Sequence, residues 1–212
     1  MSERKEKSLP AQARASRGTS DKRERILHGA IRVFARNGFY STRVSEIAEA
    51  AGVADGTIYL YFKNKDDVLI SIFQDRLDAL IRVLKREIAK CETVEAKVEK
   101  IVHLQLDLLE TDRDLAEVIT VNLRQSSRLL KEYAAPKFEA YLHIIAEVIS
   151  EGQSRGVFRD DVHPMGAARA LWGSLDGTLM TWALGDAKPS TLRKASTNIS
   201  SIFLRGLAAE GA

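Results

Sequence analysis

Two short amphipathic segments, separated by a glycine, occupy residues 44–62. In the first, the apolar side chains recur with the spacing of one face of a 3.6-residue helix, and polar side chains take the other face. Gly52 can adopt a positive φ and end this helix, and Asp55 can cap the next one. The second segment would bury Ile58 and Phe62. The pattern predicts a helix-turn-helix, although another kind of helical hairpin would share this spacing.

Helical periodicity continues on both sides of this motif. One apolar stripe predicts a helix from Ser20 or Asp21 to Asn37, and another predicts a long helix that begins near residues 63–67 and ends near Lys90. Further helices are expected near residues 93–110, 112–125, 127–155, 163–184 and 189–208. No alternating run of apolar and polar residues indicates a strand.

The predicted fold class is therefore all-α, with about nine helices. Residues 20–65 are expected to form a three-helix head that contains the helix-turn-helix, and residues 66–212 a helical body. Residues 1–19 are polar and basic and contain Pro10 and Gly18, so we expect a disordered arm there.

Charge is divided unevenly between these regions. Residues 1–65 carry 13 Lys and Arg against 7 Asp and Glu, a net charge of +6, whereas residues 66–212 carry 19 against 22, a net charge of −3. A polyanion such as double-stranded DNA would be attracted to the head alone. A solvated basic surface without such a partner would show the same charge.

Other features of the sequence indicate the cellular compartment of the protein. The sequence contains no apolar run of the length that crosses a membrane, and its first residues lack the apolar stretch of a secretory signal. The single cysteine, Cys91, excludes an internal disulfide. We therefore expect a cytoplasmic protein without a membrane partner.

The residue types that carry catalysis are not arranged for it. The four histidines are scattered without metal-ligand spacing, and neither a nucleophile motif nor a glycine-rich phosphate loop occurs. No catalytic residue, metal or cofactor is predicted, and an enzyme is not expected. An architectural DNA-binding protein would explain the basic head, but it would not need the helical body, which implies an input signal.

A family resemblance covers residues 37–69, which read NGFYSTRVSEIAEAAGVADGTIYLYFKNKDDVL. This segment resembles the DNA-binding domain of the TetR family of bacterial repressors, and the order of head, long helix and helical body resembles that family over nearly the whole chain. The resemblance implies a homodimer whose two heads bind the halves of an inverted-repeat operator and which a small molecule releases from DNA. It also implies the DNA-contacting residues Thr42, Arg43, Ser45, Gly56, Thr57, Tyr59, Tyr61 and Lys65. Arg43 can pair with a guanine or contact a phosphate.

Two segments of the body carry a more particular resemblance. They read NLRQS at residues 122–126 and ALWGSLDGTLMTW at residues 170–182, and they are similar to the FadR-type, acyl-CoA-responsive branch of the family. This resemblance implies a repressor of fatty-acid degradation genes that has long-chain acyl-CoA as its effector. A TetR-type regulator of drug efflux, with another hydrophobic ligand, is the alternative.

Polar residues within apolar helical stretches indicate where such a ligand would bind, because a buried polar group without a partner is costly. The predicted ligand-binding residues are Asn122, Arg124, Gln125, Asp176, Met180 and Trp182. We expect Arg124 and Asp176 to pair, or to share a polar network near the pocket, and so to couple two helices to its occupancy. A purely structural salt bridge is the alternative, and the aromatic residues can equally belong to the core.

Small residues gather on the helix expected at residues 163–184 and allow another helix to approach closely. Together with the last helix, this helix is expected to form the dimer interface. The family resemblance implies that the two helices of each subunit form a four-helix bundle. The predicted interface residues are Ala167, Ala170, Gly173, Ile199 and Phe203. Close packing within one chain is the alternative.

Overall fold

The computed structural model describes residues 11–125, 135–185 and 188–209. Within these ranges all regular structure is helical, apart from one isolated antiparallel bridge between Phe158 and Ala208, which confirms the all-α prediction. The α-helices are α1 (Ala11–Asn37), α2 (Val44–Ala51), α3 (Asp55–Ile58), α4 (Lys65–Ile88), α5 (Val94–Glu110), α6 (Arg113–Glu117), α8 (Ala135–Ser154), α9 (Pro164–Leu184) and α10 (Pro189–Leu207). A π-helical turn, η1 (Val118–Asn122), and a 3₁₀ turn, η2 (Leu123–Gln125), follow α6 directly.

The head consists of α1, α2 and α3, and its first helix holds the second in place. Arg25 donates hydrogen bonds to the carbonyl oxygens of Ala51 (2.7 Å) and Gly52 (3.0 Å), which lie at the C-terminal end of α2. The two helices approach so closely that a Cβ at Gly29 would stand 2.9 Å from the backbone nitrogen of Ala51. Gly52 ends α2 with φ 63°, the left-handed conformation predicted for it.

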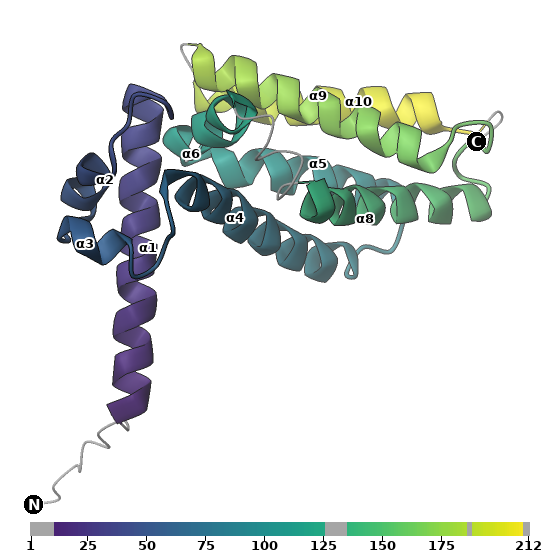
Figure 1. The fold of residues 1–212 in the computed structure, drawn as a ribbon. Coiled ribbons are helices and arrows are strands. Elements are labelled where there is room, and N and C mark those ends of the chain that lie inside the picture. The colour runs from purple at the N-terminus through teal and green to yellow at the C-terminus, as the bar shows by residue number, and fades with distance from the viewer. Residues whose placement is uncertain (1–10, 126–134, 186–187, 210–212) are drawn as a thin grey trace, which may run out of the picture.

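The body is a layered bundle in which α5 lies between two pairs of helices (Figure 1). One pair is α9 and α10, and the other is α4 and α8. The head joins this bundle where α1 packs against α4, α6 and η1. In Figure 1, α2 and α3 lie on the side of α1 that faces away from the body. This leaves the helix-turn-helix accessible at one end of the molecule.

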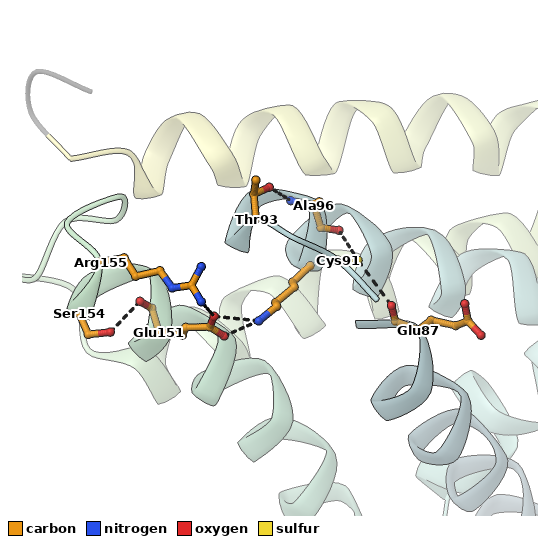
Figure 2. A network of polar contacts seen from close by, with 8 residues as sticks. Glu87, Cys91, Thr93, Ala96, Glu151, Ser154 and Arg155 are labelled. Atoms are coloured by element: carbon orange, nitrogen blue, oxygen red, sulfur yellow. Dashed lines mark hydrogen bonds and ion pairs between the residues drawn. The ribbon is translucent and has the colours of Figure 1, made fainter. Parts of the chain in front are cut away.

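The far end of α4 is tied to the rest of the body by a network of polar contacts (Figure 2). The Cys91 thiol donates to the carbonyl oxygens of Glu87 (3.5 Å) and Ala96 (3.7 Å), which stabilises the turn between α4 and α5. Lys97 on α5 then donates to both carboxylate oxygens of Glu151 on α8, at 2.8 and 2.6 Å. The thiol contacts stabilise the distal end of α4, and the Lys97 contact joins α5 to α8. The first turn of α4 follows the head directly.

Two helices depart from the sequence-based prediction. The first begins at Ala11 rather than at Ser20 or Asp21, so residues 11–19 of the expected disordered arm are helical; this segment, AQARASRGT, is rich in the strong helix formers alanine and arginine. The single helix expected at residues 112–125 is divided into α6, η1 and η2. Residues 1–10, and the start of the helix expected at residues 127–155, lie outside the described residues. None of the helices in the described ranges is long and apolar enough to span a bilayer.

Candidate functional site

The helix-turn-helix is built from local caps that the sequence encodes. Arg43 lies in extended conformation before α2, and its backbone N–H donates to the Glu46 carboxylate at 2.7 Å. Ala54, rather than Asp55, occupies the capping position of α3, and Asp55 is the first residue of that helix. Ile58 and Phe62 are buried in the hydrophobic core, as predicted. The opposite side of α3 is therefore turned outward.

Most of the predicted DNA-contacting residues lie on the outer surface of the head. The Arg43 side chain is 79% exposed and lies 3.8 Å from Glu46, so its guanidinium can reach an external ligand. The exposed members of the set are Arg43, Ser45, Gly56 and Tyr59, and the half-buried members are Thr57 and Tyr61. At Gly56 a Cβ would meet nothing within 4 Å, so a phosphate has room to approach the backbone there.

Two members of the predicted set have structural roles instead. Thr42 is only 2% exposed, and its hydroxyl donates to the Gly38 carbonyl oxygen at 2.7 Å, so it neither caps α2 nor faces outward. Lys65 donates to the carbonyl oxygens of Tyr40 (3.0 Å) and Thr42 (2.8 Å) and stands 4.7 Å from the centre of the Phe39 ring. Burial lowers the pKa of Lys65 below its usual value, although Asp66 and Glu46 oppose this effect. Both side chains hold the loop that precedes α2.

A cavity of about 330 Å³ lies within the body, at the lower end of the size range of small-molecule sites. Helices α4, α5, α8 and α9 form its wall together with the η1–η2 segment. The residues that line it are Phe73, Arg76, Leu77, Leu80, Gln105, Leu108, Leu109, Ile119, Thr120, Leu123, Arg124, Phe138, Tyr141, Trp172, Asp176 and Leu179. The lining is mostly apolar, which suits a ligand with a hydrocarbon portion.

The predicted pair of Arg124 and Asp176 is present in this lining. A guanidinium Nη2 of Arg124 lies 2.5 Å from Oδ2 of Asp176, and the other terminal nitrogen donates to the Thr120 carbonyl oxygen. The Arg124 side chain is 37% exposed, whereas that of Asp176 is 19% exposed. The pair thus joins η2 to α9 at the cavity, as the sequence-based hypothesis required.

Tyr141, Gln105 and Thr120 in the lining have hydrogen-bond partners within the chain, whereas Arg76 has none in the described ranges. The hydroxyl of buried Tyr141 donates to Oε1 of Gln105, and burial raises the pKa of this tyrosine above its usual range. Thr120 donates to the Ala116 carbonyl oxygen at 2.7 Å. The guanidinium of Arg76 makes no hydrogen bond or ion pair with any residue in the described ranges. Arg76 also lines a second, polar cleft of about 320 Å³ beside α1 and α4.

Asn122 was predicted to bind the ligand, and the structure places it elsewhere. It is 2% exposed, and its Oδ1 accepts a hydrogen bond from the backbone N–H of Phe39 at 2.8 Å. Phe39 belongs to the loop that leads into α2, so this bond joins the body to the head. The neighbouring residues Ile119, Thr120 and Leu123 line the cavity. One short segment therefore contacts both regions.

The two C-terminal candidates also lie away from the cavity. Trp182 is buried, and its indole N–H donates to the Lys188 carbonyl oxygen at 3.4 Å, whereas Met180 is half-buried; neither lines the cavity. The face of α9 that lines it carries Trp172, Asp176 and Leu179, at helical spacing, so Met180 and Trp182 project from other faces. The side chain of Gln125 lies outside the described residues.

Two protein-family models match this chain, one over the head and the start of α4 and the other over the body. Residues 26–72 match the model of the bacterial regulatory proteins of the tetR family, and residues 73–206 match the model of the C-terminal region of YsiA-like proteins. The chain belongs to the TetR family. Its head is the DNA-binding domain of a TetR-type regulator, and the chain is a regulator rather than an enzyme. In the described ranges, no three His, Cys, Asp or Glu side chains gather as a metal site would require.

Three proteins similar to this TetR regulator are named for fatty acid metabolism or degradation, or as FadR. The fatty acid metabolism regulator protein of Bacillus subtilis is 36% identical over 77% of this chain and 84% of its own length. The fatty acid degradation regulator FadR from Bacillus halodurans superposes with a TM-score of 0.83 and 34% identity over 88% of this chain and 96% of its own. FadR from Bacillus subtilis, in complex with stearoyl-CoA, superposes with a TM-score of 0.81 and 33% identity over 87% of this chain and 98% of its own. These comparisons place the chain close to the FadR-type regulators.

The residues predicted for the dimer interface of the TetR body fall into two groups. Ala167 and Ile199 are buried within the single chain, so they contribute to its own core. Ala170 and Gly173 are exposed, and a Cβ at Gly173 would meet nothing within 4 Å. Phe203 is half-buried against the core. Ala170 and Gly173 on α9 are therefore not explained by close packing inside this chain, whereas Ala167 is.

Several cavity residues had no distinctive signal in the sequence. Those on α4 recur at residues 73, 76, 77 and 80, which is the spacing of any buried helical face. Phe138 and Tyr141 on α8 stack with their ring centres 6.3 Å apart, and Phe138 meets Trp172 at 4.6 Å. An aromatic pair at i and i+3 is a weak signal that also occurs in ordinary cores.

Proposed function

We infer that this TetR regulator is a homodimeric repressor of fatty-acid degradation genes, and that long-chain acyl-CoA releases it from an inverted-repeat operator. The observation that carries this inference is the apolar cavity with a charged border. Its wall is largely hydrocarbon, but Arg76 brings a positive charge that has no partner in the described ranges, and Arg124 brings a second, paired one. A ligand with a hydrocarbon chain and an anionic end fits that distribution of polarity.

The charges also distinguish acyl-CoA from the ligands of a drug-efflux regulator. Four aromatic side chains line the cavity, and aromatic walls are common where cationic drugs bind. However, the only carboxylate among the described lining residues, Asp176, is already paired with Arg124. Arg76, which has no partner in the described part of the chain, would repel a cation. An anionic or neutral ligand is therefore favoured, and an architectural protein without a ligand would have no use for the cavity.

The η1–η2 segment provides a physical route from the cavity to the head. Ile119, Thr120 and Leu123 would contact the bound chain, while Asn122 on the same segment holds the backbone N–H of Phe39. Because the Cys91 contacts stabilise the turn at the far end of α4, expansion of the cavity would displace this segment and the first turns of α4. The two heads of a dimer would then lose the spacing that an inverted repeat requires.

The dimer itself is proposed from the outer faces of α9 and α10. Ala170 and Gly173 are exposed on α9, and Ile202 on α10 is 68% exposed although it is a large apolar residue. A second copy of these helices would cover this surface in a four-helix arrangement. Symmetric pairing would present two equal heads to the two halves of the operator.

A binding experiment tests the effector. A fluorescent DNA duplex, selected from a random pool by the protein itself, is titrated with protein, and anisotropy is followed as palmitoyl-CoA, oleoyl-CoA, butyryl-CoA, free CoA or palmitate is added. Each methylene that enters the cavity contributes up to about 0.8 kcal/mol, or about fourfold in affinity. We therefore expect the long-chain acyl-CoAs to release DNA at far lower concentrations than butyryl-CoA or CoA.

A matched variant shows whether the cavity is responsible. Leu179 is buried and lines the cavity, so Leu179→Trp would fill part of that volume. The variant should bind the same duplex as the original protein and respond only to much higher concentrations of palmitoyl-CoA. Exposed Leu184 on the same helix supplies the control substitution, Leu184→Trp, which should leave the response unchanged. If saturating palmitoyl-CoA left DNA affinity unaltered in the original protein, the proposed effector would be wrong.

A further inference from the structure

Leu60, directly beyond α3, is an apolar side chain on a surface that otherwise suits DNA. It is 80% exposed, the highest value among the large apolar side chains that remain exposed in the described residues. A single exposed leucine is ordinary in proteins. Here, however, Tyr40 and Tyr59 of the same head are also exposed. Three of the six large apolar residues that are exposed in the described ranges therefore lie in the head. This concentration in the head needs an explanation.

The turn after α3 places Leu60 on the outward face. Its backbone N–H donates to the Thr57 carbonyl oxygen at 3.2 Å, so helical geometry continues through this residue. Ile58 and Phe62 point to the core, and Gly56, four residues before Leu60, is exposed on the same side as Leu60. Because α3 lies on the side of α1 away from the body, no described element covers this face (Figure 1).

Exposed basic side chains belong to the same helix-turn-helix region. The side chain of Arg43 is largely exposed, and Lys63 is exposed one turn beyond Tyr59. Cations at the border attract the phosphates of a duplex, while an uncharged centre faces the edges of its bases. The net positive charge of residues 1–65 and these exposed cations therefore favour DNA over an apolar protein surface as the partner of Leu60.

Base pairs offer one apolar group in the major groove, the C5-methyl of thymine. We propose that Leu60 packs against a thymine methyl in each operator half-site and is a specificity-determining residue of this regulator. The side chain makes no hydrogen bond, so it contributes by excluding water from the methyl group. This inference rests on the proposed binding of DNA through α3, and it adds the type of base that the end of this element selects.

Deoxyuridine provides the test, because it differs from thymidine only by that methyl group. A duplex selected from a random pool by the full-length protein is prepared with each thymine of a half-site replaced in turn, and the dissociation constant is measured by anisotropy. Loss of one methyl contact should weaken binding about fourfold, and loss of the symmetric pair about fifteenfold. We expect this loss at one thymine position of each half-site.

Substitution of Leu60 should remove the same contact from the protein side. In Leu60→Ala, binding to the original duplex should weaken, and replacement of the sensitive thymine by deoxyuridine should have no further effect. Leu60→Met keeps an apolar side chain of similar length and should keep the sensitivity. Binding to unrelated DNA, and its dependence on salt, should be the same in all three proteins because Leu60 contacts no phosphate.

The outcomes separate this inference from the proposed function. If the original protein binds no duplex from the pool, the proposed function fails before Leu60 is tested. If it binds but no deoxyuridine weakens binding, or if Leu60→Ala retains the same sensitivity, the assignment of Leu60 is overturned. A change in oligomeric mass with unchanged DNA affinity in Leu60→Ala would instead identify a protein contact and also overturn it.

Discussion

Removal of the Asn122 side chain should weaken the link between the ligand cavity and the DNA-binding head. In Asn122→Ala the backbone N–H of Phe39, buried at the junction, would lose its acceptor at 2.8 Å. An unsatisfied buried donor costs about 1–3 kcal/mol, a large share of the ~5–15 kcal/mol that stabilises an ordinary domain. We therefore expect a lower midpoint of urea unfolding by circular dichroism, with an unchanged slope if the transition remains two-state.

The same substitution should reduce the response to the effector. Coupling is measured as the ratio of the DNA dissociation constants with and without saturating palmitoyl-CoA. If the Asn122 bond carries about 1 kcal/mol of this coupling, the ratio should fall about fivefold. Thr120→Val is the matched control, because it also removes a buried hydrogen bond of η1, to Ala116, but leaves the link to Phe39 intact. That variant should keep the wild-type ratio when saturated with effector.

The reasoning would be refuted if Asn122→Ala unfolded at the wild-type urea concentration and released DNA with the wild-type ratio. Equal losses of coupling in Asn122→Ala and Thr120→Val would also count against it, because they would attribute the effect to general loosening of η1. A loss confined to Asn122→Ala would assign the effect to the bond with Phe39.

Three other expectations follow from individual contacts. Asp176→Asn should free Arg124 for an anionic ligand and raise the affinity for palmitoyl-CoA, measured by calorimetry, by up to about fivefold, whereas Arg124→Gln should lower that affinity. Weaker binding in both variants would show that the intact pair is required. Lys65→Met should lower the melting temperature of the DNA-free protein because two backbone carbonyl groups lose their donor, and an unchanged melting temperature would contradict this role. The hydrogen bond from Lys97 lowers the pKa of Glu151, so its stabilising effect is present above the usual pKa of a glutamate and disappears as the pH falls through the lowered value. Thermal melts of Glu151→Gln and the original protein should therefore differ at neutral pH and converge in strong acid.

The sequence was sufficient for the organisation of the head because its signals are local. The end of α2 at Gly52 and the buried positions Ile58 and Phe62 depend on neighbouring residues alone, whereas the predicted cap at Asp55 was wrong because Ala54 occupies that position. Thr42 and Lys65 were assigned by resemblance to DNA contacts, and the structure gives them internal partners instead. Those partners are backbone carbonyl groups, which have no signature in a sequence.

Within the body, polar residues were more informative than apolar ones. Arg124 and Asp176 stood out because a charge in an apolar helical stretch needs a partner, and each proved to be the partner of the other. Asn122 was also correctly singled out as buried, but its partner is a backbone N–H that lies 83 positions away. The apolar cavity wall was not predictable, because a helical face that surrounds a cavity has the same spacing as one that fills a core. The π-helical turn was not predictable either, since nothing in VITVN distinguishes it from an ordinary helix.

The shared use of the η1–η2 segment has a consequence for how this regulator can acquire new inducers. Substitutions there act on the segment that carries both the inducer contacts and the bond to Phe39, so the two properties are harder to select separately at these positions. Helices α5, α8 and α9 do not pack extensively against the head in the described ranges, and altered inducer preference should accumulate on their cavity faces. Libraries for a biosensor with a different inducer are accordingly best built on positions such as Leu108, Phe138 and Trp172, with the residues from Val118 to Leu123 held constant.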